Sequence, residues 1–133
     1  IFPRKLQIKV IIYKPYAIYN RQVIAMDGAI LDTTSTPKNL PIIIDHINNR
    51  NSAQSILLVA EDHLSELDFK IRKLELFDSL VRIHTQKNIL ISDKKNLQLN
   101  LNRLVDSYDD LQKVFKKEIK SIDMRYSNGF AIK

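Results

Sequence analysis

The sequence predicts an α+β fold, a largely antiparallel (mixed) sheet with two helices packed on one face. Short segments of alternating apolar and polar residues, typical of half-buried strands, recur along the chain. Two longer segments, at about Ser52–Glu66 and Lys94–Lys117, carry apolar residues at helical spacing. The resulting order is several strands, a helix, three strands, a helix and a final strand. This segregation of strands and helices indicates the α+β class.

The first part of the chain is expected to be strands. Lys5–Lys14 alternates imperfectly, and Pro15 ends that strand or places it at an edge, because proline donates no ladder hydrogen bond. Asp27-Gly28 is a strong signal for a hairpin turn. Residues 32–41 are polar with two prolines and are expected to form a loop. The other short strands are expected at Tyr16–Tyr19, Gln22–Met26, Ala29–Leu31 and Ile42–Ile44.

Both helices have a recognisable start. Asn51 or Ser52 can cap the first helix, and Asp93 is the expected N-cap of the second. Lysines near the end of the second helix complement its dipole. The two apolar stripes comprise Ala53, Ile56, Leu57, Ala60 and Leu64, and Leu97, Leu101, Leu104, Val105, Tyr108, Leu111 and Phe115. The strands between the helices are expected at Phe69–Phe77, Leu80–Thr85 and Ile89–Ser92.

The final segment of the chain alternates as a strand does. Ile122, Met124 and Tyr126 fall on one face, with polar residues on the other. The last strand of a chain often lies at a sheet edge, where its free N–H and C=O groups can receive a strand from another protein. We therefore expect a partner-binding edge here.

A bend is expected within this segment. Gly129 is one of only two glycines, which indicates a positive φ or a close approach there. We expect Arg125–Ile132 to be a bent or bulged single strand, because Phe130–Lys133 leaves little chain for a return strand. A tight hairpin at Asn128-Gly129 is the alternative.

Backbone pairing alone would bind a partner too weakly. Five hydrogen bonds of ~0.5–1.5 kcal/mol each give roughly 2.5–7 kcal/mol, whereas micromolar affinity needs about 8 kcal/mol. Tyr126 is the expected side-chain anchor, with ordinary core packing as the alternative. Arg125, on the opposite face, is expected to pair with a carboxylate of the partner.

Composition limits the other possibilities. The chain of 133 residues is about one domain, and the absence of cysteine excludes disulfides and thiolate sites. Its net charge of +6 is spread along the sequence, which is typical of charge on solvated faces; an acidic protein partner is the alternative. The chain opens on Ile1 within a strand-like pattern, so we expect a fragment whose membrane anchor lies outside it.

Nothing in the sequence points to catalysis. Gly28 and Gly129 are too far apart for a phosphate-binding loop. No serine lies in a nucleophile elbow, and adjacent carboxylates on a helix point in different directions. The histidines, none at metal-ligand spacing, are His46, His63 and His84. We therefore expect a non-enzymatic protein without a metal or cofactor.

Nucleic-acid binding is the competing hypothesis. Lysines and tyrosines interleave near the N-terminus, as they do on sheets that bind single strands. These tyrosines fall mostly in register with core-facing positions, so core packing is favoured. The residues concerned are Lys9, Tyr13, Lys14, Tyr16 and Tyr19.

Four segments resemble the FtsQ/DivIB family of bacterial cell-division proteins. Asp123–Gly129, which reads Asp-Met-Arg-Tyr-Ser-Asn-Gly, is similar to the Asp-Leu-Arg-Tyr-x-x-Gly of its C-terminal strand. Phe2–Val10 and Lys14–Tyr19 resemble the end of its POTRA domain and the junction with its β domain. Met26–Gly28 is similar to the hairpin that follows. The chain departs from the family pattern at Ser127, where many relatives have proline, and at Lys133, where it stops.

The resemblance implies a fold and a function. Residues 1–14 would be the terminal strand of a truncated POTRA domain, and residues 15–133 a β domain in which two helices flank a bent sheet. The protein would be a scaffold of the division machinery, anchored in the inner membrane by one span, with this domain in the periplasm. FtsB-like and FtsL-like division proteins would be its partners, the former adding a strand. The implied contact residues are Arg82, Arg125, Tyr126, Ser127, Asn128, Gly129 and Phe130.

Overall fold

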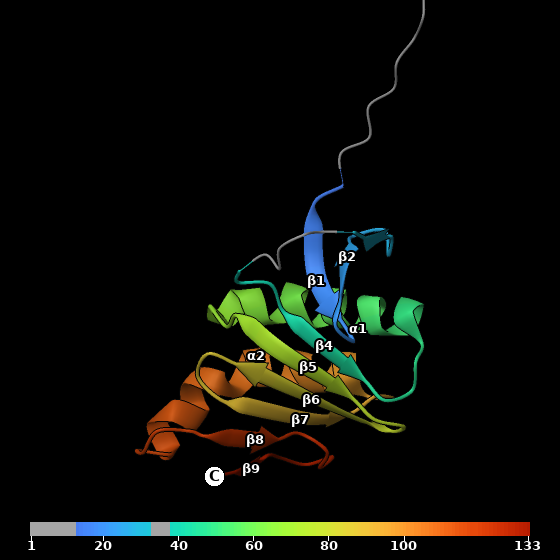
Figure 1. Ribbon diagram of the computed structural model, residues 1–133. Helices are drawn as coiled ribbons and strands as arrows, with labels where there is room; N and C mark the ends of the chain where they lie inside the picture. The colour runs from blue at the N-terminus through green and yellow to red at the C-terminus, as the bar shows by residue number, and fades with distance from the viewer. Residues whose placement is uncertain (1–12, 33–37) are drawn as a thin grey trace, which may run out of the picture.

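The computed structural model describes residues 13–32 and 38–133, whose strands form one nine-stranded sheet in the order β3-β2-β1-β4-β5-β6-β7-β8-β9 (Figure 1). Five neighbouring pairs are antiparallel, and three pairs, β1 with β4, β4 with β5 and β7 with β8, are parallel. Both helices lie on the same face of the sheet, behind it in this view. The predicted α+β fold with a mixed, largely antiparallel sheet is confirmed.

The strands fall close to the predicted segments. Before the first helix come β1 (Pro15–Tyr19), β2 (Gln22–Ala25), β3 (Ile30–Leu31) and β4 (Ile42–Asp45). After it come β5 (Ile71–Leu76), β6 (Leu80–Thr85), β7 (Ile89–Asp93), β8 (Ser121–Asp123) and β9 (Ala131–Ile132). The expected strand at Lys5–Lys14 lies, up to residue 12, outside the described residues, and residues 13 and 14 belong to no strand.

The two helices are the crossovers of two parallel pairs. Helix α1 (Arg50–Leu64) continues into a 3₁₀ turn at Ser65–Leu67 and links β4 to β5. Helix α2 (Leu97–Val114) links β7 to β8. Parallel neighbours need such a long connection, because the chain must return to the starting end of the sheet. Neither helix in the described part of the chain is long and apolar enough to cross a bilayer.

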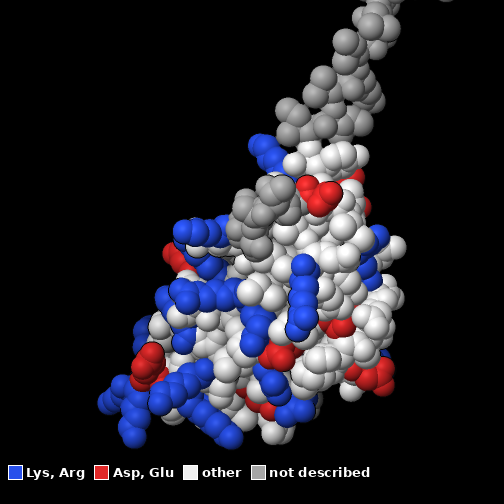
Figure 2. Space-filling view, viewed as in Figure 1, with Lys and Arg blue, Asp and Glu red and all other residues white. Residues whose placement is uncertain are grey.

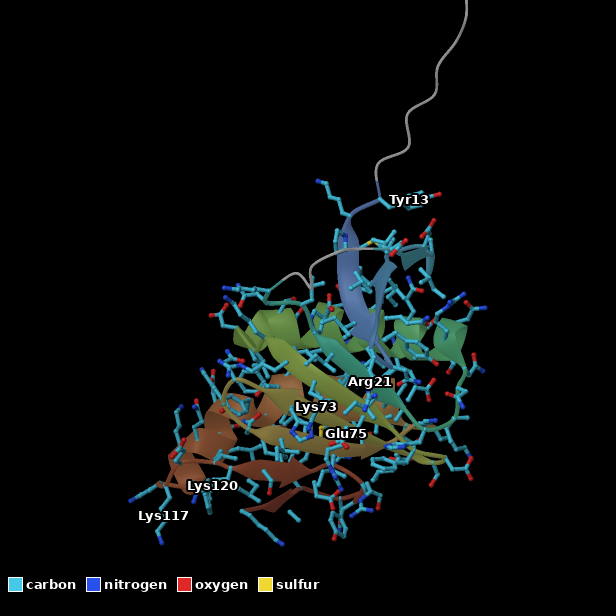
Figure 3. All side chains as sticks on the ribbon, in the orientation of Figure 1. Tyr13, Arg21, Lys73, Glu75, Lys117 and Lys120 are labelled. Atoms are coloured by element: carbon cyan, nitrogen blue, oxygen red, sulfur yellow. The ribbon has the colours of Figure 1, made fainter. Side chains whose placement is uncertain are left out.

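The core lies between the sheet and the helices. Every second strand residue points into it, and the apolar stripe of each helix packs against these residues. The largest fully buried side chains are Ile24, Ile43, Leu57, Leu64, Leu74, Leu76, Ile83, Leu90, Leu101, Leu104, Ile122 and Met124. The intervening strand residues form an open face, on which Lys73 and Glu75 are seen near the middle of the sheet (Figure 3).

The helix starts differ from those predicted. Asn49 caps α1, since its side-chain oxygen accepts from the Ser52 amide at 3.1 Å. The predicted caps Asn51 and Ser52 lie within the helix. Asp93 does not cap α2: it is the last residue of β7, and its carboxylate accepts from the Asn96 amide group at 2.6 Å. The chain needs residues 94–96 to turn from sheet to helix, which moves the helix start forward.

The Asp27-Gly28 turn is confirmed. Gly28 has φ of 90°, a conformation that glycine adopts without strain. The Ala25 amide donates to the Ala29 carbonyl at 2.9 Å, so β2 and β3 pair as a hairpin.

Candidate partner-binding edge

Strand β9 forms the outer margin of the sheet beside the chain end (Figure 1). Ile132 lies opposite Ile122 of β8, and the next residue, Lys133, exchanges hydrogen bonds with Ser121 at 3.0 and 3.2 Å. Because hydrogen bonding alternates along an antiparallel strand, the backbone groups of Ile132 face away from β8. Within the part of the chain that the structure describes, no strand pairs with that outer side.

The chain reaches this margin through a hairpin, so the predicted bent single strand over Arg125–Ile132 is wrong. β8 ends at Asp123, residues 124–130 form a loop, and β9 returns antiparallel. The Met124 amide still donates to the Ile91 carbonyl of β7 at 2.7 Å. β7 itself ends two residues after Ile91, so a straight continuation would soon lack a neighbour. The alternative, a tight hairpin at Asn128-Gly129, does not form either, because seven residues join the two strands and neither Asn128 nor Gly129 has positive φ.

Gly129 does not have the special backbone that the sequence predicts. Among the described glycines, positive φ occurs at Gly28. A Cβ atom added at Gly129 would meet no atom within 4 Å. The loop therefore does not depend on glycine at this position, and that prediction is wrong.

Arg103 of α2 holds the loop against the helix. Its guanidinium donates to the carbonyl of Tyr126 at 3.0 Å, to the carbonyl of Gly129 at 3.1 Å and to the side-chain oxygen of Asn100 at 3.1 Å. The same group lies over the Phe130 ring, 4.9 Å from its centroid. The two hydrogen bonds to loop carbonyls and the contact with the Phe130 ring together fix the shape of the loop. Sequence reasoning missed Arg103, because no local pattern connects a helix residue with a loop 23 positions later.

Arg125 is bound to the chain's own carboxylate. Its Nε lies 2.9 Å from Oδ1 of Asp123, and its Nη2 lies 2.6 Å from Oδ2. The hydrogen bond from Arg125 lowers the pKa of Asp123, although burial of the carboxylate opposes that effect. A partner carboxylate would thus meet an arginine that is already paired in a bidentate way.

Tyr126 lies at the surface. Its side chain is 51 % exposed, so the alternative of core packing does not hold. Met124, two residues earlier, is fully buried as the alternation predicts. A shallow hollow of about 220 Å³ beside β9 is lined by Tyr126, Asn128, Gly129, Phe130 and Ala131. The aromatic ring and the free strand edge are therefore adjacent.

Arg82 lies on the open face of the sheet, two strands away from β8. It pairs in register with Ile91 of β7, which pairs with Asp123 of β8. Its guanidinium lies 3.8 Å from Glu75 and 5.6 Å from the centroid of the Phe77 ring. Six of the seven expected contact residues therefore lie in the loop before β9. The seventh, Arg82, lies on β6 and is linked to Asp123 through their shared cross-strand neighbour, Ile91.

Glu75 joins the cations around Arg82 into one cluster. His84 lies 2.6 Å from the Glu75 carboxylate, and Lys73 is the neighbouring cation on β5. Burial raises the pKa of Glu75, but the bond to His84 and the charges of Lys73, His84 and Arg82 outweigh it, so the net shift is downward. A carboxylate surrounded in this way stays ionised on the open face.

The tyrosines near the N-terminus do not form a stacking surface. Tyr19 is buried, and its hydroxyl donates to Asp45 at 2.7 Å. Burial, together with this bond, raises the pKa of Tyr19 to about 12. Tyr16 is partly buried and bonds to Glu61 at 3.4 Å. Among the described members of the predicted set, only Tyr13 and Lys14 are exposed, so core packing of Tyr16 and Tyr19 is confirmed.

Two further findings bear on the site. In residues 13–32 and 38–133, no group of three or more His, Cys, Asp or Glu side chains is placed to hold a metal ion. No protein-family model matches the chain, and no curated protein sequence matches it.

Proposed function

We propose that this chain is the extracytoplasmic β domain of an FtsQ/DivIB-type division protein, a non-enzymatic scaffold that binds a partner by strand addition. The partner would be an FtsB-like protein, with an FtsL-like protein as its companion. The free edge of β9, with the exposed ring of Tyr126 beside it, is the observation that carries this proposal. The motif resemblance at both ends of the chain and the order of strands and helices support it.

The edge offers few backbone groups, so side chains must provide much of the affinity. Within β9, Ile132 presents one N–H and one C=O group outward. At ~0.5–1.5 kcal/mol each, these two groups contribute roughly 1–3 kcal/mol, below the about 8 kcal/mol of micromolar binding. The hollow beside Tyr126 supplies a site for an apolar side chain of the partner. Arg82 lies farther away and would contact a partner that also covers the open face.

The test is capture of a peptide with the sequence of the FtsB-like protein encoded in the same genome. Tyr126→Glu is expected to abolish binding in isothermal titration calorimetry, because it places a charge where an apolar contact is needed. Tyr13→Glu is the matched control, since Tyr13 is 47 % exposed and lies at the opposite end of the molecule (Figure 3). Both variants should keep the circular dichroism spectrum of the parent. Equal binding by the two variants would refute the anchor role of Tyr126.

The competing function, nucleic-acid binding, is favoured by one observation. Lys and Arg side chains gather at the end of α2 and the start of β8, at the lower left of Figure 2. That function predicts affinity for single-stranded oligonucleotides that falls steeply with salt concentration. It also predicts that Tyr126→Glu leaves this affinity unchanged.

A further inference from the structure

Five exposed lysines form a basic corner next to the free edge. They come from the β6–β7 turn, the segment after α2 and the chain end, and are Lys87, Lys116, Lys117, Lys120 and Lys133. Figure 3 labels Lys117 and Lys120 at the end of the molecule where the chain passes from α2 to β8. Among the described residues, none of the five forms an ion pair.

Backbone contacts tie this corner to the edge. The Lys120 amide donates to the Lys133 carbonyl at 2.8 Å, and the Lys120 carbonyl accepts from Ile89 at 3.0 Å. Lys116 and Lys117 line a hollow of about 420 Å³. Glu118 lies on the same hollow and offsets one charge, so the corner as a whole remains positive.

The two ends of the edge therefore differ in chemistry. The loop end has the aromatic hollow with Tyr126 and Phe130. The other end has Lys120 and Lys133, which the last backbone bonds of the β8–β9 ladder hold together. A strand added along Ile132 would run from the aromatic hollow to the basic corner.

We infer that the strand which adds to β9 carries acidic residues at the end that lies over Lys117, Lys120 and Lys133. This inference rests on the proposed function and specifies the chemistry of its partner. The lysines alone would also attract a nucleic acid, but the free backbone edge beside Lys133 favours a protein segment, because only a polypeptide can extend a β ladder. The tyrosines that could have stacked with bases bond instead to Glu61 and Asp45.

The lysines are expected to make a modest contribution to the affinity for the added strand. Exposed lysine–carboxylate pairs are weak, and three of them together correspond to about a tenfold change in Kd. Such pairs are screened by salt, so the preference should fade as ionic strength rises.

Three synthetic peptides test the inference by nuclear magnetic resonance titration of the labelled chain. All three contain the core Thr-Val-Thr-Val-Thr. Three glutamates follow the core in the first peptide and precede it in the second, and three glutamines follow it in the third. We expect one glutamate peptide to bind about tenfold more tightly than the glutamine peptide, with shifts at both Ile132 and Lys120. The glutamate peptide that binds more tightly reports the direction of the added strand, because its glutamates are the ones that lie over the lysines.

Matched variants assign the preference to the lysines. Lys117→Gln combined with Lys120→Gln should remove the advantage of the glutamate peptide and leave the glutamine peptide unchanged. Lys14→Gln combined with Lys38→Gln removes the same charge from exposed positions before β1 and β4, and should preserve the advantage.

The other outcomes separate the inference from the proposed function. Equal affinity for all three peptides would overturn the inference and leave edge pairing intact. Shifts at Lys120 without shifts at Ile132 would overturn the link between charge and edge. No shift at Ile132 with any peptide at millimolar concentration would overturn both. Tighter binding of an oligothymidine than of every peptide would favour the nucleic-acid function instead.

Discussion

The guanidinium of Arg103 donates to the carbonyl oxygen of Tyr126 across 3.0 Å and thereby joins helix α2 to the loop before β9. The exposed Tyr126 therefore lies on a loop whose backbone is held in place by a side chain of helix α2. A recognition side chain on a preorganised loop loses less entropy on binding than one on a free chain.

Replacing Arg103 should loosen the loop. Arg103→Met is expected to lower the free energy of unfolding by about 1–3 kcal/mol, because it removes hydrogen bonds from a charged donor. It should also raise hydrogen exchange at the amides of residues 125–130. Urea denaturation and exchange by mass spectrometry measure the two effects. Arg72→Met, at an exposed arginine of β5, is the control and should change stability by less than about 0.5 kcal/mol. Unchanged exchange in the loop would contradict the role of Arg103.

Acid should weaken the ion pair that starts the loop. The pKa of Asp123 in the folded state is lowered by Arg125 from its ordinary value of 3.8. The unfolded state therefore binds a proton at Asp123 more readily than the folded state does below about pH 4. The stability that this carboxylate contributes is present above that pH and is lost as the pH falls through the lowered folded-state pKa. Unfolding free energies measured from neutral pH to about pH 2 should show a shallower acid slope for Asp123→Asn. Asp109→Asn, an exposed carboxylate of α2, should keep the parental slope.

The apolar stripe of α2 can be tested with two leucines two positions apart. Leu101 is fully buried, and Leu101→Ala should cost about 2–5 kcal/mol of unfolding free energy. Leu99 is 59 % exposed, and Leu99→Ala should cost less than about 0.5 kcal/mol. Thermal and denaturant unfolding provide the comparison. Similar costs at the two positions would mean that α2 is rotated relative to the sheet.

The start of α1 distinguishes the cap seen in the structure from the one expected from sequence. Asn49→Ala removes the acceptor of the Ser52 amide and should lower stability by about 0.5–2 kcal/mol. Asn51→Ala, one residue into the helix, removes no capping bond and should have little effect. Denaturant unfolding of both variants decides between the two positions, and a larger loss for Asn51→Ala would restore the sequence-based cap.

Local patterns predicted most of the elements. Leu80–Thr85 was predicted as a strand with the same bounds that the structure has, because its alternating residues report burial on one face. The order of strands and helices followed from the same patterns, except that two strands, β8 and β9, follow α2 in place of one. The caps were less accurate, since several polar residues compete at each helix start and the connection length decides among them.

The edge position of the last strand was predicted, but the shape of the loop before it was not. Alternation correctly buried Ile122 and Met124, and it also put Tyr126 on the buried face, although Tyr126 is exposed. The chain leaves the strand after Asp123 because β7 ends nearby and because Arg103 binds the loop carbonyls. Neither cause is visible within the segment itself.

By itself, the sequence determined most of the buried positions and the order of the strands and helices up to β8, because burial leaves a periodic pattern in neighbouring residues. Only the tertiary structure decided that β1 lies beside β4 and that β9 turns back along β8 to form the outer edge. The physical reason is that a strand's periodicity records that it has a buried face but not which strand lies next to it. The shape of the loop, likewise, depends on a donor in α2 that its own residues do not specify.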